Sequence, residues 1–166
     1  MAKVLLVIAP KDYQDQEYND TKTELINKGH KVITVSTEKT ASGKLGGSTE
    51  VDLLLKDTHS TDYDAVAFIG GPGVYDFFDY PPILDLAKEF YNAGKITAAI
   101  CAAPAILARA GILKDKTASC FSGVEPELKN AGAAYTPDPT HQEGKIITAS
   151  GPSAAKNFGL LIAKNL

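Results

Sequence analysis

Short apolar runs rich in β-branched residues recur along the chain, and stretches with helical features lie between most of them. The runs cover residues 4–9, 31–36, 65–69, 96–100 and 145–149. Runs of this length without polar alternation are typical of strands buried on both faces of a parallel sheet. Strands that alternate with helices predict an α/β fold, with a mostly parallel central sheet covered by helices on both faces.

The stretches between these runs carry helix-start prolines, helix-stop glycines or loop-forming residues. Helices are predicted over residues 18–28, 82–92, 104–110, 126–131 and 153–164. Short strands are predicted over residues 51–55, near an edge of the sheet, and over residues 117–121. The polar, glycine-rich stretch 37–48 and the proline-punctuated stretch 135–143 are predicted to be loops.

Size, charge and cysteine content limit the classes of protein that fit. The chain has 166 residues, 44% of them hydrophobic, which predicts a single domain over residues 1–166. A net charge of −3 with scattered lysines and arginines gives no electrostatic case for nucleic acid or an anionic membrane. The first residues read as a strand and not as a leader, and two cysteines form neither a disulfide framework nor a metal site. We therefore expect a cytoplasmic protein without a metal.

Cys101 lies at the point where a predicted buried strand turns into a helix. Residues 96–100 precede it, Pro104 suits the first helical position, and Gly111 can end the helix. A strand-to-helix turn places the thiol near backbone N–H groups and a helix start, which both favour thiolate over thiol. This arrangement matches a nucleophile elbow with sulfur as the nucleophile. The alternative for any cysteine is a small buried apolar residue.

Loops that follow parallel strands meet at one edge of the sheet, and four such loops are predicted to meet near Cys101. They cover residues 10–17, 70–73, 101–103 and 150–152. The first brings Glu17, which can donate to the sulfur if burial and the neighbouring negative charge raise its pKa. The alternative for Glu17 is an acidic residue in the first turn of a helix. The rivals for an acidic role are Asp12, Asp15, Asp20 and Glu24.

The glycine-rich loop 70–73 supplies backbone N–H groups to the same edge. The N–H groups of Gly71 and Ala102 could together form an oxyanion hole. The alternative for this loop is a tight turn. Further pocket residues are expected at Gly70, Pro72, Ser150 and Gly151, whereas Cys120 is predicted to lie in the core and the three histidines in solvated positions.

These motifs occur in an order that resembles the DJ-1/ThiJ/PfpI family, most closely its DJ-1 and YajL-like branch. The resemblance rests on AICAAPAILARAG around Cys101, the glycines at 70–73, the early Glu17, and TASGP before the last helix. It implies a flavodoxin-like three-layer sandwich, usually homodimeric. It also implies Cys101 as the reactive cysteine, Glu17 as its carboxyl partner, and Gly71 and Ala102 as amide donors. Ser150 stands where many relatives have arginine.

The resemblance also implies an activity, for which no cofactor is expected. The leading hypothesis is a glyoxalase-like enzyme that acts on methylglyoxal or related α-oxoaldehydes, which are small carbonyl compounds. The alternative is a redox-sensing protective or chaperone-like protein that uses the same oxidisable cysteine. An intracellular cysteine peptidase is a third reading. It is disfavoured because Ala102 stands where the protease-like branch has a histidine.

Overall fold

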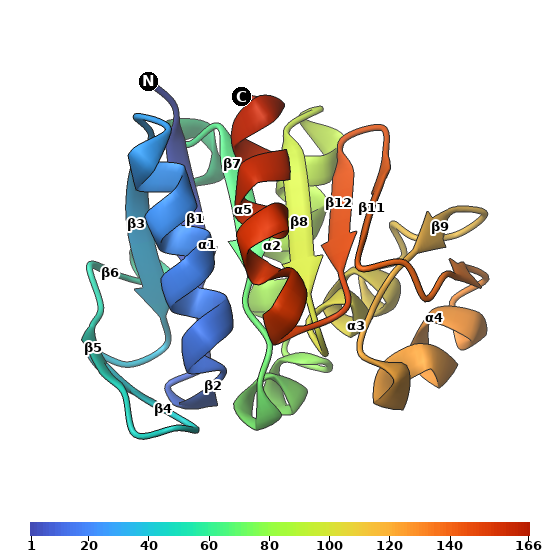
Figure 1. Cartoon of the computed structure of the whole chain (residues 1–166), viewed down its shortest axis with the longest axis horizontal. Coiled ribbons are helices and arrows are strands. Elements are labelled where there is room, and N and C mark those ends of the chain that lie inside the picture. Colours follow the sequence, from blue (N-terminus) through green and yellow to red (C-terminus); the bar gives the residue numbers. More distant parts are fainter.

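A computed structural model describes residues 1–166 and has a seven-stranded central sheet (Figure 1). The strand order is β11-β12-β8-β7-β1-β3-β6, and every neighbouring pair is parallel except β11 with β12. The strands are β1 (Lys3–Val7), β3 (Lys31–Ser36), β6 (Leu53–Leu54), β7 (Ala65–Phe68), β8 (Ile96–Ile100), β11 (Thr140–Glu143) and β12 (Ile146–Ala149). The mostly parallel sheet predicted from the sequence is confirmed.

Helices cover both faces of this sheet and complete a three-layer sandwich. These helices are α1 (Asp15–Asn27), α2 (Pro81–Asn92), α3 (Pro104–Arg109) and α5 (Ala155–Lys164), while α4 (Glu125–Asn130) packs against α3 at the side of the molecule. In Figure 1, α1 and α5 lie side by side in front of the sheet, while α2 and α3 lie behind it. None of these helices combines the length and the apolar character that crossing a membrane requires.

The sheet is buried on both sides, as its apolar strands predict. All five residues of β8 and all four of β7 are buried. Their side chains alternate between two hydrophobic clusters, one under α2 and α3 and the other under α1 and α5. Close contact of α1 with α5 depends on Gly159, because a Cβ there would lie 3.0 Å from both Glu24 Cβ and the Thr21 carbonyl oxygen.

Several local predictions were wrong, mainly where strands are polar. The predicted loop 37–48 contains β4 (Thr40–Gly43), which forms a small sheet with β2 (Lys11–Tyr13) and β5 (Ser48–Glu50). The predicted loop 135–143 ends in β11. Of the predicted strand 117–121, only β9 (Thr117–Ala118) forms, and it pairs with β10 (Ala134–Tyr135) apart from the main sheet.

Two helices begin two or three residues away from the predicted start. Helix α1 begins at Asp15, three residues earlier than predicted, because the Gln14 side chain accepts a hydrogen bond from the Glu17 N–H at 2.7 Å. The last helix is preceded by a 3-10 turn over Pro152–Ala154, so that α5 itself begins at Ala155. The earlier start of α1 places Glu17 inside a helical turn at the carboxyl edge of the sheet.

Candidate functional site

Cys101 directly follows β8 and has a left-handed backbone conformation. Its φ of 65° is uncommon for a residue with a side chain and costs on the order of 1–3 kcal/mol. Two hydrogen bonds hold this conformation: the Cys101 N–H donates to the Ala149 carbonyl at 2.9 Å, and its carbonyl accepts from the Phe121 N–H at 2.7 Å. The central sheet therefore supports a sharp turn at the thiol.

Glu17 lies in the first turn of α1 and is fully buried. Its Oε1 accepts a hydrogen bond from the Gly70 N–H at 3.0 Å. Its Oε2 is buried without a hydrogen-bond partner, and the Cys101 thiol is the side-chain group that interacts with this carboxyl. The sequence predicts that the Cys101 and Glu17 side chains lie close together, and they interact in the structure.

Burial dominates the ionisation of both groups. It raises the pKa of Glu17 to about 7, although hydrogen bonds from Cys101 and from the Gly70 N–H partly oppose this shift. Burial, followed by the negative charge of Glu17, raises the pKa of the Cys101 thiol, while the Ala102 N–H acts in the opposite direction. The turn alone therefore does not ionise the thiol. Because each charge opposes the other, the pair holds one proton and one negative charge above neutral pH.

Gly70 is the point of contact among these groups. A Cβ at residue 70 would lie 2.8 Å from Cys101 Cβ, from Glu17 Oε1 and from the Ile100 carbonyl oxygen. Its own carbonyl accepts a hydrogen bond from the Gln14 N–H at 2.9 Å, which ties the loop to the start of α1. Only glycine lets the backbone approach the thiol and the carboxyl this closely.

The predicted amide donors face a cavity beside the thiol. Gly71 has a φ of 112°, and neither its N–H nor that of Ala102 donates to a backbone carbonyl or to a side-chain oxygen. The Ala102 N–H interacts with the Cys101 sulfur. Both residues line the cavity with Cys101, so their N–H groups are available to an oxygen of a bound molecule.

The cavity measures about 420 Å³ and mixes apolar and polar side chains. It is lined by Gln14, Lys44, Gly71, Pro72, Tyr75, Cys101, Ala102, Phe121 and Pro152. Pro72 lines it as predicted, whereas Glu17 and Gly70 contact the thiol without lining the cavity. Ser150 and Gly151 do not line it either: the Ser150 N–H is bonded to the Pro139 carbonyl, and the wall here is made by Pro152.

Four side chains on this wall were missed by sequence reasoning: Gln14, Lys44, Tyr75 and Phe121. Tyr75 lies on a 3-10 helix over Pro72–Phe77 and is 47% exposed. Burial, and then the negative charge of Cys101, raise the pKa of its phenol, and both residues line the same cavity. The glycines at residues 70–73 indicate that the backbone can approach a ligand closely. They do not indicate that the later side chain of Tyr75 lines the same cavity.

The second cysteine and the histidines take no part in this cavity. Cys120 is 1% exposed and lies in the core, as predicted. None of the three histidines lines the cavity, and Nδ1 of His30 accepts a hydrogen bond from the Ala2 N–H at 3.2 Å. No Cys–His pair forms at Cys101.

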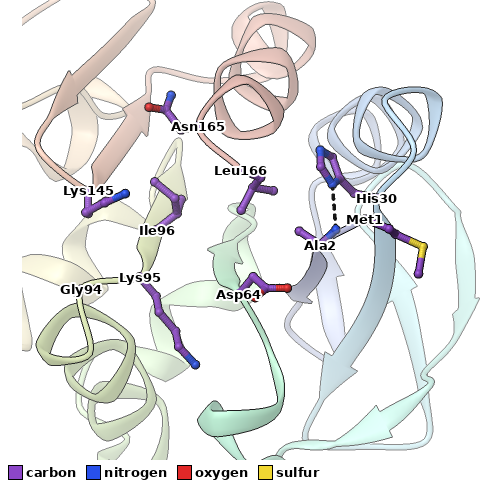
Figure 2. A pocket seen from close by; sticks show the side chains of 10 residues that line it. All are labelled: Met1, Ala2, His30, Asp64, Gly94, Lys95, Ile96, Lys145, Asn165 and Leu166. Carbon is purple, nitrogen blue, oxygen red and sulfur yellow. Dashed lines mark hydrogen bonds between the residues drawn. The ribbon is translucent and has the colours of Figure 1, made fainter.

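A second pocket of about 380 Å³ lies at the opposite, amino edge of the sheet (Figure 2). It is lined by Met1, Ala2, His30, Asp64, Gly94, Lys95, Ile96, Lys145, Asn165 and Leu166. The Lys95 ammonium donates to the carbonyls of Ser60 and Tyr63, at 2.8 and 2.7 Å. This pocket contains no thiol, hydroxyl or buried carboxyl, so the chemistry concentrates at the Cys101 cavity.

Comparison with known proteins agrees with this architecture. The DJ-1/PfpI family model matches residues 2–165. An uncharacterized protein of Methanocaldococcus jannaschii is 41% identical, over 98% of this chain and 82% of its own length. A glutathione-independent glyoxalase of Caenorhabditis elegans is 30% identical, over 98% of this chain and 87% of its own. Other relatives are named deglycases and a putative cysteine protease.

A solved structure shows the same fold. The ThiJ/PfpI domain protein of Brachyspira murdochii superposes with a TM-score of 0.95 and 34% identity. The match covers 98% of this chain and 94% of that protein. The full-length family match and the shared three-layer architecture lead to one conclusion: the chain belongs to the DJ-1/PfpI family.

Proposed function

We propose that the protein is a cofactor-independent, glyoxalase-type enzyme that converts methylglyoxal or related α-oxoaldehydes into 2-hydroxy acids through Cys101. One observation carries the proposal: a thiol at a cavity shares a proton with a fully buried carboxyl whose pKa is about 7. A general acid or base works best when its pKa lies near the operating pH. The relatives named glyoxalase and deglycase support the same class of reaction.

The first step is addition of sulfur to the aldehyde carbon. Glu17 takes the thiol proton as the sulfur attacks, and the new C–S bond gives a hemithioacetal. The N–H groups of Gly71 and Ala102 stabilise the negative charge that develops on the aldehyde oxygen. Glu17 then returns its proton to that oxygen and is again a carboxylate.

The second step moves a hydrogen between the two carbonyl carbons. Glu17 removes the proton from the former aldehyde carbon, which gives an enediolate. It then delivers this proton to the neighbouring carbon, while the hydroxyl proton moves from the former aldehyde oxygen to the former ketone oxygen, which gives a thioester of the 2-hydroxy acid on Cys101. Water attacks the thioester, the C–S bond breaks, and the sulfur recovers a proton. No electrons leave the substrate, so no redox cofactor is consumed.

Consumption of methylglyoxal without glutathione tests this proposal. Wild type is expected to form lactate, Cys101→Ser to lose at least about 100-fold of kcat/KM, and Glu17→Gln a similar amount, because nucleophile and proton carrier act as a unit. Thermal denaturation of each variant controls for folding. Equal rates in all three proteins would overturn the proposal.

A second candidate function is redox sensing, which the unequal exposure of the two cysteines favours. Cys101 is partly exposed at a cavity, whereas Cys120 is 1% exposed. Two molecules of hydrogen peroxide, each reduced to water, would oxidise the Cys101 thiol to a sulfinic acid, and protonated Glu17 would donate to it. Peptide mass spectrometry after mild peroxide is expected to show a gain of two oxygen atoms at Cys101. Oxidation confined to Cys120 would exclude this role.

A further inference from the structure

The cavity beside Cys101 carries a single charged side chain on its wall. Lys44 is the only lysine, arginine, aspartate or glutamate among the nine lining residues. It belongs to none of the four ion pairs in the structure, and its ammonium donates no hydrogen bond within the protein. The rest of the wall is backbone, glutamine, aromatic rings and prolines, so an anion entering the cavity meets one positive charge.

The turn that carries Lys44 is fastened to the helix that carries Glu17. Asp15, 8% exposed in the first turn of α1, accepts the Leu45 N–H at 2.7 Å and the Gly47 N–H at 2.8 Å. The Lys44 N–H itself donates to the Tyr13 carbonyl at 2.9 Å. Both oxygens of Asp15 therefore accept backbone N–H groups just after Lys44, and neither oxygen pairs with the lysine ammonium.

Glycines next to this turn let the carboxylate come close. A Cβ at Gly43 or at Gly47 would collide with the Asp15 side chain. The Gly43 N–H also donates to the Gly47 carbonyl at 2.8 Å, which closes the turn. The position of the Lys44 backbone relative to Glu17 is thus set by several short hydrogen bonds, and only the lysine side chain remains free to adapt.

We propose that the cavity prefers α-oxoaldehydes that carry a carboxylate at the far end from the reacting carbons, and that Lys44 determines this specificity. The inference rests on the proposed function. A cavity of about 420 Å³ is of the size that holds drug-like ligands and is much larger than methylglyoxal requires. A longer substrate would fill it along the rings of Tyr75 and Phe121. As the one charged side chain on the wall, the lysine is the group that would offset the negative charge that Cys101 and Glu17 share, a charge that repels an anion.

The first experiment tests the anion preference without any turnover. Iodoacetate and iodoacetamide alkylate the same sulfur and differ mainly in charge, so the ratio of their rates at Cys101 reports the electrostatic bias of the cavity. Lys44→Met is expected to lower this ratio by about two- to fivefold, the range of exposed charge pairs. Lys44→Arg should retain the ratio. The bias should fade in about 1 M salt.

Lys56→Met is the matched control, because Lys56 is also exposed but does not line the cavity. It removes the same net charge and is expected to leave the alkylation ratio unchanged. An equal ratio in wild type and Lys44→Met, or an equal drop in Lys56→Met, would overturn the proposal.

The second experiment compares two substrates, 4,5-dioxopentanoate and its neutral methyl ester. Wild type is expected to favour the acid in kcat/KM, and Lys44→Met to lower the acid-to-ester ratio about two- to fivefold, mainly through KM. If neither wild type nor Lys44→Met prefers the acid to the ester, the assigned substrate class is overturned. If methylglyoxal is consumed but neither of these compounds is, the assigned substrate class fails and the proposed function stands. If none of the three is consumed while alkylation still depends on Lys44, the proposed function fails and the anion preference of the cavity stands.

Discussion

The role proposed for Glu17 needs a raised pKa, and this raised pKa lowers the stability of the folded protein at neutral pH. The Glu17 carboxyl has a pKa of about 7 in the folded protein and an ordinary value of 4.5 in a solvated chain. Below pH 4.5 it is protonated in both states and adds no pH dependence. Between the two values the unfolded chain releases its proton first, so the free energy of unfolding falls as the pH rises, by about 3 kcal/mol in total.

Glu17→Gln should remove this loss of stability. The amide oxygen can still accept the Gly70 N–H, but the side chain no longer ionises. Between pH 4.5 and pH 8, the free energy of unfolding of the variant is expected to rise relative to wild type by up to about 3 kcal/mol. Urea denaturation across this range measures the difference. The exposed Glu38→Gln serves as control, and parallel pH curves for wild type and Glu17→Gln would contradict the expectation.

Gly70 gives a second prediction at the scale of a single residue. Gly70→Ala would place a methyl group 2.8 Å from two backbone or Cβ atoms and a carboxyl oxygen, none of which can withdraw easily. The expected cost is about 1–3 kcal/mol of unfolding free energy, together with slower alkylation of Cys101. Gly151→Ala is the control, since it has an extended backbone and no atom within 4 Å of the added Cβ. Equal stability of the two variants would contradict the assigned close approach.

Among the elements, the turn between β4 and β5 depends on one carboxylate of α1. Asp15→Asn leaves one acceptor oxygen for two partly buried N–H groups, and the loss of a hydrogen bond to a charged group is expected to lower the unfolding free energy by about 1–3 kcal/mol. Faster hydrogen exchange at Leu45 and Gly47 would localise the effect. Asp20→Asn, on the same helix and without a hydrogen-bonded partner, is the control. If it loosened the turn equally, the turn would not depend on Asp15.

The elements that sequence reasoning predicted well are those with a strong local signal. Strands β1, β7, β8 and β12 are continuous apolar runs, and burial on both faces leaves few alternatives. Strand β4, with the sequence TASG, has no such signal, because it exists only through pairing with β2 and β5. The early start of α1 was not predicted either, because its N-cap residue is a glutamine, which is not a preferred capping residue.

Over the whole molecule, the proximity of Cys101 and Glu17 could be predicted, but the walls of the cavity could not. Cys101 and Glu17 follow from strand order, because loops at the carboxyl ends of parallel strands must meet. The positions of Lys44, Tyr75 and Phe121 depend on how three separate segments pack, which no local pattern encodes. Ser150 was predicted to line the cavity, but its N–H donates to the Pro139 carbonyl. Pro152, two residues later, forms this part of the wall instead.

We also expect the complete protein to be a homodimer, as the family resemblance implies. Light scattering coupled to size-exclusion chromatography should then report twice the chain mass of 17.6 kDa. A mass of one chain at micromolar concentration would contradict this. Because Phe121, at the mouth of the cavity, is 43% exposed, its protection from solvent in hydrogen-exchange or labelling experiments would show whether a second copy covers the site.

The thiol follows a strand of the main sheet and its carboxyl partner lies on α1, whereas Lys44 lies in the turn between β4 and β5 of the three-stranded sheet. Selection could therefore exchange the residues of that accessory sheet and retune which molecules enter, while the reacting atoms keep their spacing. Within such a lineage, differences in substrate would then arise from substitutions at a few surface positions, and the reaction itself would be retained.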